Sequence, residues 1–153
     1  MPDSDAYEHH PDQGLVPRWC ADHFGIEPAV FAEHVFWRPV GGRLIRVAAR
    51  ACRPPEGMGL DSIGMQVMRR PPPRGKPTSV FLQRFGGTAT RNVYRLDDAQ
   101  TDSFLRRMPV SVRPVDDARG YAIVFGPDGV LGCGRVDGEL LRSEIPKAWL
   151  HDG

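Results

Sequence analysis

The sequence predicts an α+β fold, in which a small α+β N-terminal subdomain is followed by a mostly antiparallel β-barrel with flanking helices. Glycine and proline supply 17 and 15 of the 153 residues, which favours many turns and short strands over a helix bundle. The second half shows a helix pattern, a strand, another helix and three closely spaced strands. A chain of this length is sufficient for one domain or two small ones.

Three segments divide the chain. Residues 1–14 lack hydrophobic periodicity and are expected to form a disordered tail. Residues 15–72 are expected to form the α+β subdomain, and residues 73–153 the barrel domain. The boundary is expected near PPPRGKP (71–77), because proline lacks the backbone N–H that a helix or a central strand requires.

Two helices open the first subdomain. Apolar residues from Leu15 onward recur at helical spacing, and Gly25 is suited to end that helix. Pro28 is suited to open a second, short helix. His23 and His34 are interpreted as capping or partly buried packing residues, because nothing near them in sequence forms a catalytic pair.

Three strands follow. Two strand-like runs, VFWRPV and RLIRVAA, flank Gly41-Gly42, which predicts a β-hairpin. Alternation along the second run places Arg46 on the face opposite Ile45 and Val47. After a loop over residues 53–62, IGMQVMRR predicts a further strand.

The barrel domain is predicted to begin with a helix in SVFLQRFGG that stops at Gly86-Gly87. TRNVYRL then predicts a strand with Val93 facing inward. Asp97 and Gln100 have the spacing of a capping box, which opens a second helix. That helix is expected to bury Phe104, Leu105 and Met108.

The last third predicts three strands joined by tight turns. YAIVFG (121–126) is apolar almost throughout, so we expect an interior strand of its sheet. Pro127-Asp128-Gly129 and Asp137-Gly138 are turn sequences. Gly132 and Gly134 leave one strand face without side chains, which allows the close approach of backbone or ligand, or marks a barrel bend.

The formal net charge of +1 conceals an uneven distribution. Residues 1–37 carry seven acids and one arginine, residues 38–95 carry twelve bases and two acids, and residues 96–153 carry seven bases and ten acids. Eighteen of the 20 basic residues are arginine, whose planar guanidinium binds phosphate with two parallel hydrogen bonds. The middle segment therefore favours a polyanionic partner.

Enzymatic motifs are missing from the sequence. It contains no glycine-rich phosphate loop, no nucleophile elbow and no credible metal-ligand spacing, so neither a cofactor nor a metal is expected. The acidic pairs Asp97-Asp98 and Asp116-Asp117 have turn or helix-start surroundings, and Cys133 is interpreted as a small buried hydrophobe. We therefore expect no catalytic activity.

The composition also indicates a compartment. The three cysteines stand far apart, which suits a reduced cytoplasm better than a disulfide framework. No apolar run has the length of a membrane span, and the acidic start is unlike a signal peptide. A cytoplasmic protein without membrane contact is expected.

A resemblance covers much of the chain. From Lys76 to Leu150, the pattern KPTSVFLQRFGG, ATRNVYRL, GYAIVF and DGVLGCGRVDGELLRSEIPK resembles the PUA-like RNA-binding domain at the C-terminus of RsmF-type, Sun-family RNA cytosine-C5 methyltransferases. That domain also occurs in small stand-alone archaeal proteins, and residues 15–72 resemble the α+β region before it. Without an S-adenosylmethionine loop or a catalytic cysteine motif, the resemblance implies RNA binding and not methyl transfer.

The resemblance implies a grip on structured RNA, tRNA or rRNA, between a helix and a barrel edge. It implies an accessory role in RNA modification or ribosome assembly, with an RNA methyltransferase or a ribosome-assembly protein as a further partner. Arginine and asparagine suit phosphate and 2′-hydroxyl contacts. The implied RNA-binding residues are Arg69, Arg70, Arg74, Lys76, Arg84, Arg91, Asn92, Arg135, Arg142 and Lys147.

Two other functions remain open from the residues alone. The basic segment is also suited to dock an acidic protein, such as a separately encoded RNA methyltransferase. The third hypothesis is an enzyme that uses Cys133 or the paired aspartates in a small-molecule pocket. It requires those side chains to border a cleft.

Overall fold

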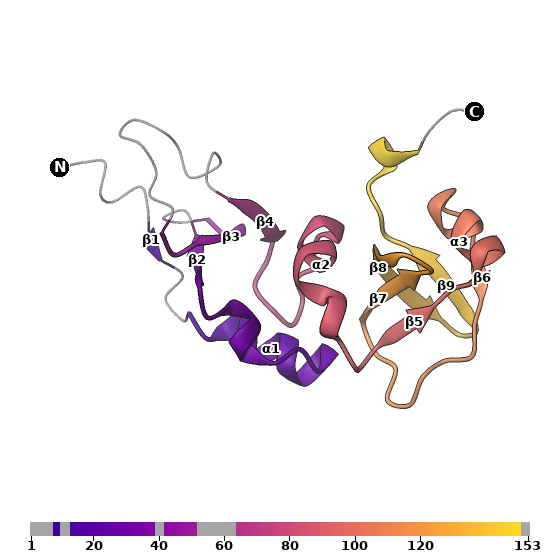
Figure 1. Ribbon diagram of the computed structural model, residues 1–153, viewed down its shortest axis with the longest axis horizontal. Coiled ribbons are helices and arrows are strands. Elements are labelled where there is room, and N and C mark those ends of the chain that lie inside the picture. Colours follow the sequence, from indigo (N-terminus) through magenta and orange to yellow (C-terminus); the bar gives the residue numbers. More distant parts are fainter. Residues whose placement is uncertain (1–7, 10–12, 39–41, 52–63, 151–153) are drawn as a thin grey trace. The chain divides into compact units, whose positions relative to one another are not determined.

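The computed structural model describes residues 8–9, 13–38, 42–51 and 64–150, and Figure 1 shows the order of the elements. Residue contacts divide the chain into two compact units. The first comprises Met1–Asp22 and Ile26–Lys76, and the second comprises His23–Gly25 and Pro77–Gly153. No helix in the described ranges is long and apolar enough to cross a membrane.

The first unit contains a four-stranded antiparallel sheet with the strand order β1-β2-β3-β4. As predicted, an α-helix begins at Leu15 and Gly25 follows its end with a φ of +67°, while the short helix at Pro28 is a 3-10 helix. The elements are α1 (Leu15–Phe24), η2 (Pro28–Phe31), β1 (Glu8–His9), β2 (His34–Arg38), β3 (Ile45–Ala49) and β4 (Met65–Met68).

The predicted hairpin strands pair in antiparallel fashion, with Phe36 opposite Val47. Gly41 and the predicted loop over residues 53–62 lie outside the described residues. Both faces of β3 are buried, because Arg46, on the face opposite Ile45 and Val47, is only 7% exposed. Its Nη2 donates to the carbonyl oxygen of Gly64 at 3.0 Å, which compensates for the loss of water around the guanidinium.

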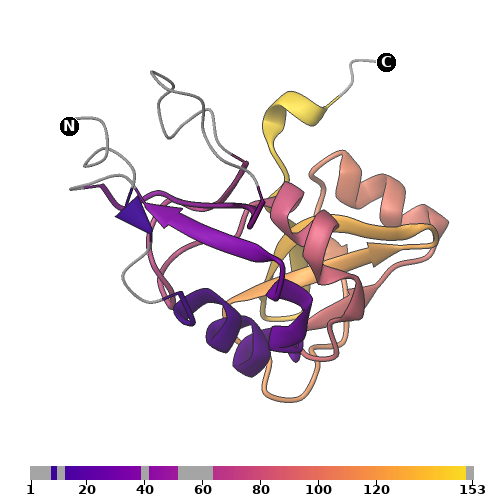
Figure 2. The same ribbon diagram turned by 60° about the vertical axis from the view of Figure 1, so that its left-hand side comes forward.

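The second unit contains a five-stranded sheet that curls into a half-barrel, with the strand order β5-β7-β8-β9-β6 (Figure 2). Only the β5–β7 pair is parallel, and the other pairs are antiparallel. The elements are α2 (Ser79–Phe85), η4 (Gly86–Thr88), β5 (Val93–Arg95), α3 (Asp98–Leu105), β6 (Val110–Ser111), β7 (Tyr121–Gly126), β8 (Gly129–Asp137), β9 (Leu140–Ser143) and η5 (Lys147–Trp149). The predicted α+β fold is confirmed.

Local signals placed the elements of this unit well, but not all of their core residues. The capping box is present, since Asp97 accepts from the Gln100 N–H and the Gln100 side chain accepts from the Asp97 N–H. The helix ends at Leu105, however, and Leu105 and Met108 are 41% and 55% exposed, so only Phe104 of the three predicted residues enters the core.

On β5, Val93 was predicted to face inward, but it does not belong to the half-barrel core. Val93 is half-buried, while Tyr94 is 5% exposed and belongs to the half-barrel core. Strand alternation allows only one of these neighbours to face that core, and the parallel pairing with β7 selects Tyr94. The rest of the core includes Leu96, Phe104, Ala122, Val124, Leu141 and Ile145.

The glycines of β8 allow the close approach that the sequence predicted: α2 approaches Gly132, and side chains of β7 and β9 approach Gly134. A Cβ on Gly132 would lie 2.6 Å from the Ser79 Oγ of that helix, and one on Gly134 would lie 2.8 Å from Val124. The Ser79 hydroxyl accepts the Cys133 N–H at 3.0 Å. The space is therefore filled by the chain itself rather than by a ligand.

Candidate nucleic-acid interface

An aromatic ring and two arginines form a row across the start of β7, the end of β8 and β9. Tyr121 is the register partner of Arg135, and Arg135 is the register partner of Arg142, so the three side chains share one face of the sheet. The guanidinium carbon of Arg135 lies 5.9 Å from the centroid of the Tyr121 ring, within cation–π range.

A second stacked pair lies further along β7 on the same face. Arg95 on β5 is the register partner of Phe125, and its guanidinium carbon is 4.4 Å from the ring centroid. Residues 121, 123 and 125 share this face, because side chains alternate along a strand. The two rings, at positions 121 and 125, are four positions apart along β7, which corresponds to about 13 Å.

Helix α2 and the 3-10 helix η4 cover this face between the two pairs. A Cβ on Gly86 would lie 3.1 Å from the Ile123 Cδ1, so η4 sits directly on the residue between the two rings. The α2 helix contributes a third stacked arginine, Arg84, whose guanidinium carbon is 5.2 Å from the Phe85 ring centroid. Phe85 itself is buried.

Arg84, Arg95 and Arg135, which we call the stacked arginines, share an electrostatic property. All three are exposed, and within the described part of the chain none forms an ion pair with a carboxylate. A stacked guanidinium uses its planar face, while its N–H donors point outward in the plane. The stacked arginines are therefore held in position by aromatic rings and keep their donors for a ligand.

Other arginines of this unit are paired with acids. Arg106 lies 3.2 Å from the Asp102 carboxylate, and Arg142 lies 3.5 Å from the Asp137 carboxylate. Both pairs are well exposed, so each stabilises the fold little and breaks readily when a stronger anion is present. Arg142 can therefore add its charge to the row that Tyr121 and Arg135 form. Arg106, which lies over no ring within the described ranges, can be compared with the stacked arginines in a binding experiment.

The ten residues implied by the resemblance are divided between the two units. Four exposed residues, Arg69, Arg70, Arg74 and Lys76, belong to the first unit. The other six belong to the second unit. Of those, Arg84, Arg91, Arg135, Arg142 and Lys147 are exposed, and Asn92 is buried.

Asn92 has a structural role in this arrangement. It is 9% exposed and adopts a φ of +52°, in the left-handed region that asparagine tolerates. Its side-chain amide donates to the His23 carbonyl oxygen at 2.8 Å, and its Oδ1 accepts the Arg119 N–H at 3.2 Å. Both ends of the amide are thus engaged within the second unit, where they link His23, the residue before β5 and the segment before β7.

Sequence reasoning missed Tyr121, Phe125 and Arg95 as members of this surface. The apolar run 121–126 was interpreted only as an interior strand, although alternation along it already placed Tyr121 and Phe125 on one face. Arg95 faces Phe125 only because β5 and β7 pair in parallel in this register. No sequence signal specifies that register.

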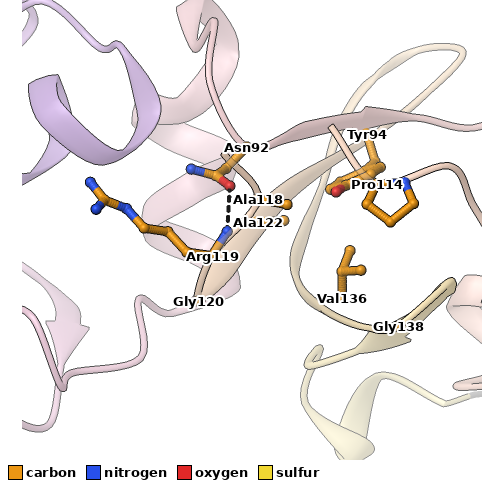
Figure 3. A pocket seen from close by; sticks show the side chains of 9 residues that line it. All are labelled: Asn92, Tyr94, Pro114, Ala118, Arg119, Gly120, Ala122, Val136 and Gly138. Carbon is orange, nitrogen blue, oxygen red and sulfur yellow. Dashed lines mark hydrogen bonds between the residues drawn. The ribbon is translucent and has the colours of Figure 1, made fainter. Parts of the chain in front are cut away.

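Figure 3 shows a cavity of about 170 Å³. Its lining residues include Gly120 and Ala122, which flank Tyr121, and Val136, which follows Arg135. Its lining comes from β5, the segment before β7, the start of β7 and the β8–β9 turn. The lining residues are Asn92, Tyr94, Pro114, Ala118, Arg119, Gly120, Ala122, Val136 and Gly138. The dashed line in Figure 3 is the hydrogen bond from the Arg119 N–H to the Asn92 Oδ1.

The groups considered for catalysis do not converge on this cavity. Cys133 is fully buried, as predicted, and is not among the lining residues. Asp97 accepts a helix N-terminal N–H, while Asp116 and Asp117 are exposed. Within the described ranges, no group of three or more His, Cys, Asp or Glu residues is arranged to hold a metal ion.

Comparison with known families agrees with this geometry. Residues 91–151 match the family described as the methyltransferase RsmF PUA domain. Over this segment, which is less than half of the chain, the protein is similar to the PUA-like domain of RsmF-type methyltransferases. That similarity suggests RNA binding in a methyltransferase-associated context. No curated protein matches the chain.

Proposed function

We propose that the chain is an RNA-binding module for structured RNA, tRNA or rRNA, that assists RNA modification or ribosome assembly and performs no catalysis of its own. The observation that carries the proposal is the set of stacked arginines on one sheet face and the helix over it. Structured RNA presents phosphates and 2′-hydroxyls, which accept from donors of this kind.

The spacing of the stacked arginines supports contacts to several nucleotides. Arg95 and Arg135 flank rings about 13 Å apart along β7, a separation larger than one nucleotide. A single small anion would engage one of these arginines, whereas a polynucleotide engages them together. This favours a polymeric anion over a free phosphate or a mononucleotide.

The exposed bases of the first unit, Arg69, Arg70, Arg74 and Lys76, are assigned to the same RNA in this proposal. They lie close together in sequence, immediately before the second unit, and are exposed. Their contribution is sequence-independent attraction to phosphates, which falls as salt rises. The cytoplasm, where tRNA and rRNA are abundant, is the proposed location.

Filter binding of the full chain to total tRNA at several salt concentrations tests the proposal. Affinity is expected to fall linearly with salt on a logarithmic scale. Alanine at Arg84, Arg95 or Arg135 is expected to weaken binding about threefold to tenfold and to reduce the slope by about 1. Arg106→Ala is the matched control, since that exposed arginine caps the end of α3 and lies over no aromatic ring among the described residues, and it is expected to leave both quantities unchanged.

Two results would contradict the proposal. The first is the absence of tRNA affinity even at low salt. The second is equal loss in Arg106→Ala and in the stacked-arginine variants, which would mean that net charge alone governs binding. The alternative function is the docking of an acidic protein. Capture of partners by the chain from nuclease-treated lysate distinguishes it from RNA binding, because a direct protein contact survives nuclease and an RNA-mediated contact does not.

A further inference from the structure

The cavity at the end of the half-barrel has the size of a single ring. A cavity of about 150 Å³ accommodates benzene, and the cavity here measures about 170 Å³. Its walls include four apolar side chains, those of Pro114, Ala118, Ala122 and Val136. These apolar side chains suit the flat face of a ring, while the polar part of the cavity surface suits the polar edge of a base. The volume favours one ring over two fused rings.

One polar group in the cavity wall is the hydroxyl of Tyr94. Tyr94 is 5% exposed, and its hydroxyl oxygen accepts the Val115 N–H at 3.1 Å. Among the described residues, no acceptor for the hydroxyl hydrogen lies within hydrogen-bond distance. The hydroxyl can therefore donate to a ligand that brings an acceptor into the cavity.

The cavity and the RNA-binding face meet at the same strand ends. Gly120 and Ala122 line the cavity and flank Tyr121, and Val136 lines it and follows Arg135. Successive side chains on a strand point to opposite faces. The Tyr121–Arg135 pair and the cavity therefore lie on opposite faces of the same end of the sheet. An RNA strand held at this pair passes that end.

We propose that this cavity receives one unpaired pyrimidine base of the bound RNA. A carbonyl oxygen or a ring nitrogen of the base accepts from the Tyr94 hydroxyl, and the apolar side chains contact the faces of the ring. An unpaired base enters at little cost, because no base pair is broken. The inference rests on the proposed function, and it adds a base contact to the phosphate contacts of the stacked arginines.

Titration of the full chain with cytidine or uridine, followed by amide NMR, tests the cavity directly. Both nucleosides are expected to cause saturable shifts at the amides of Tyr94, Gly120 and Val136, and guanosine, which has two fused rings, is expected to cause none there. Ala118→Leu enlarges a side chain of the cavity wall at an exposed position and is expected to abolish the shifts. Ala99→Leu, at an exposed position of α3, is the matched control and is expected to retain them.

The outcomes separate this inference from the proposed function. Absence of saturable shifts, or shifts that persist in Ala118→Leu, would overturn the cavity assignment while leaving tRNA binding by the stacked arginines intact. Nucleoside binding in a chain without tRNA affinity would overturn the proposed function and support the cavity. If both hold, Ala118→Leu weakens tRNA binding about fivefold with an unchanged salt slope, because a base contact releases no counterion.

Discussion

Tyr121 and Arg135 lie directly opposite each other on β7 and β8, with the Arg135 guanidinium carbon 5.9 Å from the centroid of the Tyr121 ring. The pair lies where the face that carries the stacked arginines and the cavity reach the same end of the half-barrel. A single cross-strand contact thus positions an exposed cation beside both features.

Replacement of Tyr121 by leucine keeps an apolar side chain but removes the ring that supports Arg135. We expect tRNA affinity to fall about threefold to tenfold, because a cation–π contact stabilises a guanidinium by about 0.5–2 kcal/mol. Filter binding measures the change, and urea denaturation reports whether folding is affected. Tyr121→Phe keeps the ring and should bind like the unmodified chain, so equal losses in both variants would contradict a role for the ring face.

Gly132 is predicted to tolerate no side chain. Its φ is +154°, and a Cβ there would lie 2.6 Å from the Ser79 Oγ and 2.9 Å from the Ile145 Cγ2. Gly132→Ala is expected to reduce the free energy of unfolding by about 2 kcal/mol or more, because it combines backbone strain with overpacking.

Gly87→Ala is the control for that substitution, since a Cβ at Gly87 meets no atom within 4 Å. It is expected to change the free energy of unfolding by about 0.5 kcal/mol or less. Urea denaturation of both variants provides the comparison. Similar stability of the two variants would mean that β8 moves away from α2 at low cost.

The capping box of α3 gives a third prediction. Asp97→Ala removes the acceptor of the Gln100 N–H at 2.8 Å and is expected to destabilise the protein by about 1 kcal/mol. Asp116→Ala, at an exposed position outside any helix, is expected to have no measurable effect. Thermal and urea unfolding monitor both variants, and a neutral Asp97→Ala would show that packing of Phe104 alone holds the helix.

Cys20 predicts a pH dependence of stability. Burial raises the pKa of its thiol from 9.0 to about 12, because the thiolate would lose its hydration. The folded state therefore retains a proton that the unfolded state releases above pH 9. This contribution to stability is complete below pH 9 and is lost as the pH rises towards 12, by up to about 1.4 kcal/mol per pH unit.

Urea denaturation between pH 8 and about 11 tests this sign. The Cys20→Ala variant lacks the thiol, so its stability is expected to fall less steeply above pH 9 than that of the unmodified chain. The comparison cancels the titration of other groups that both proteins share. Parallel curves for the two proteins would show that the Cys20 thiolate is accommodated in the folded state.

Much of the second unit follows from short-range sequence signals. The Asp97–Gln100 spacing determined the start of α3, and the Pro127-Asp128-Gly129 turn determined the link between β7 and β8. The apolar run 121–126 was rightly predicted as an interior strand. These features depend on residues a few positions apart, whose hydrogen bonds and conformational preferences act before the chain is compact.

Features that depend on strand register could not be predicted from such short-range sequence signals. Val93 and Tyr94 are equally plausible core residues in an isolated strand, and the pairing of β5 with β7 decided between them. The burial of Asn92 depends on the carbonyl of His23, 69 positions away. Such long-range contacts are set by packing that no local pattern encodes.

For this protein, the sequence by itself determined the fold class, most element boundaries and an abundance of arginine, because these are properties of composition and local spacing. The tertiary structure decided which arginines lie over aromatic rings and lack carboxylate partners. It also decided that Tyr94, whose hydroxyl accepts the Val115 N–H, lines a cavity. The reason is physical: stacking, pairing and burial are relations between side chains that meet only when distant strands adopt one register.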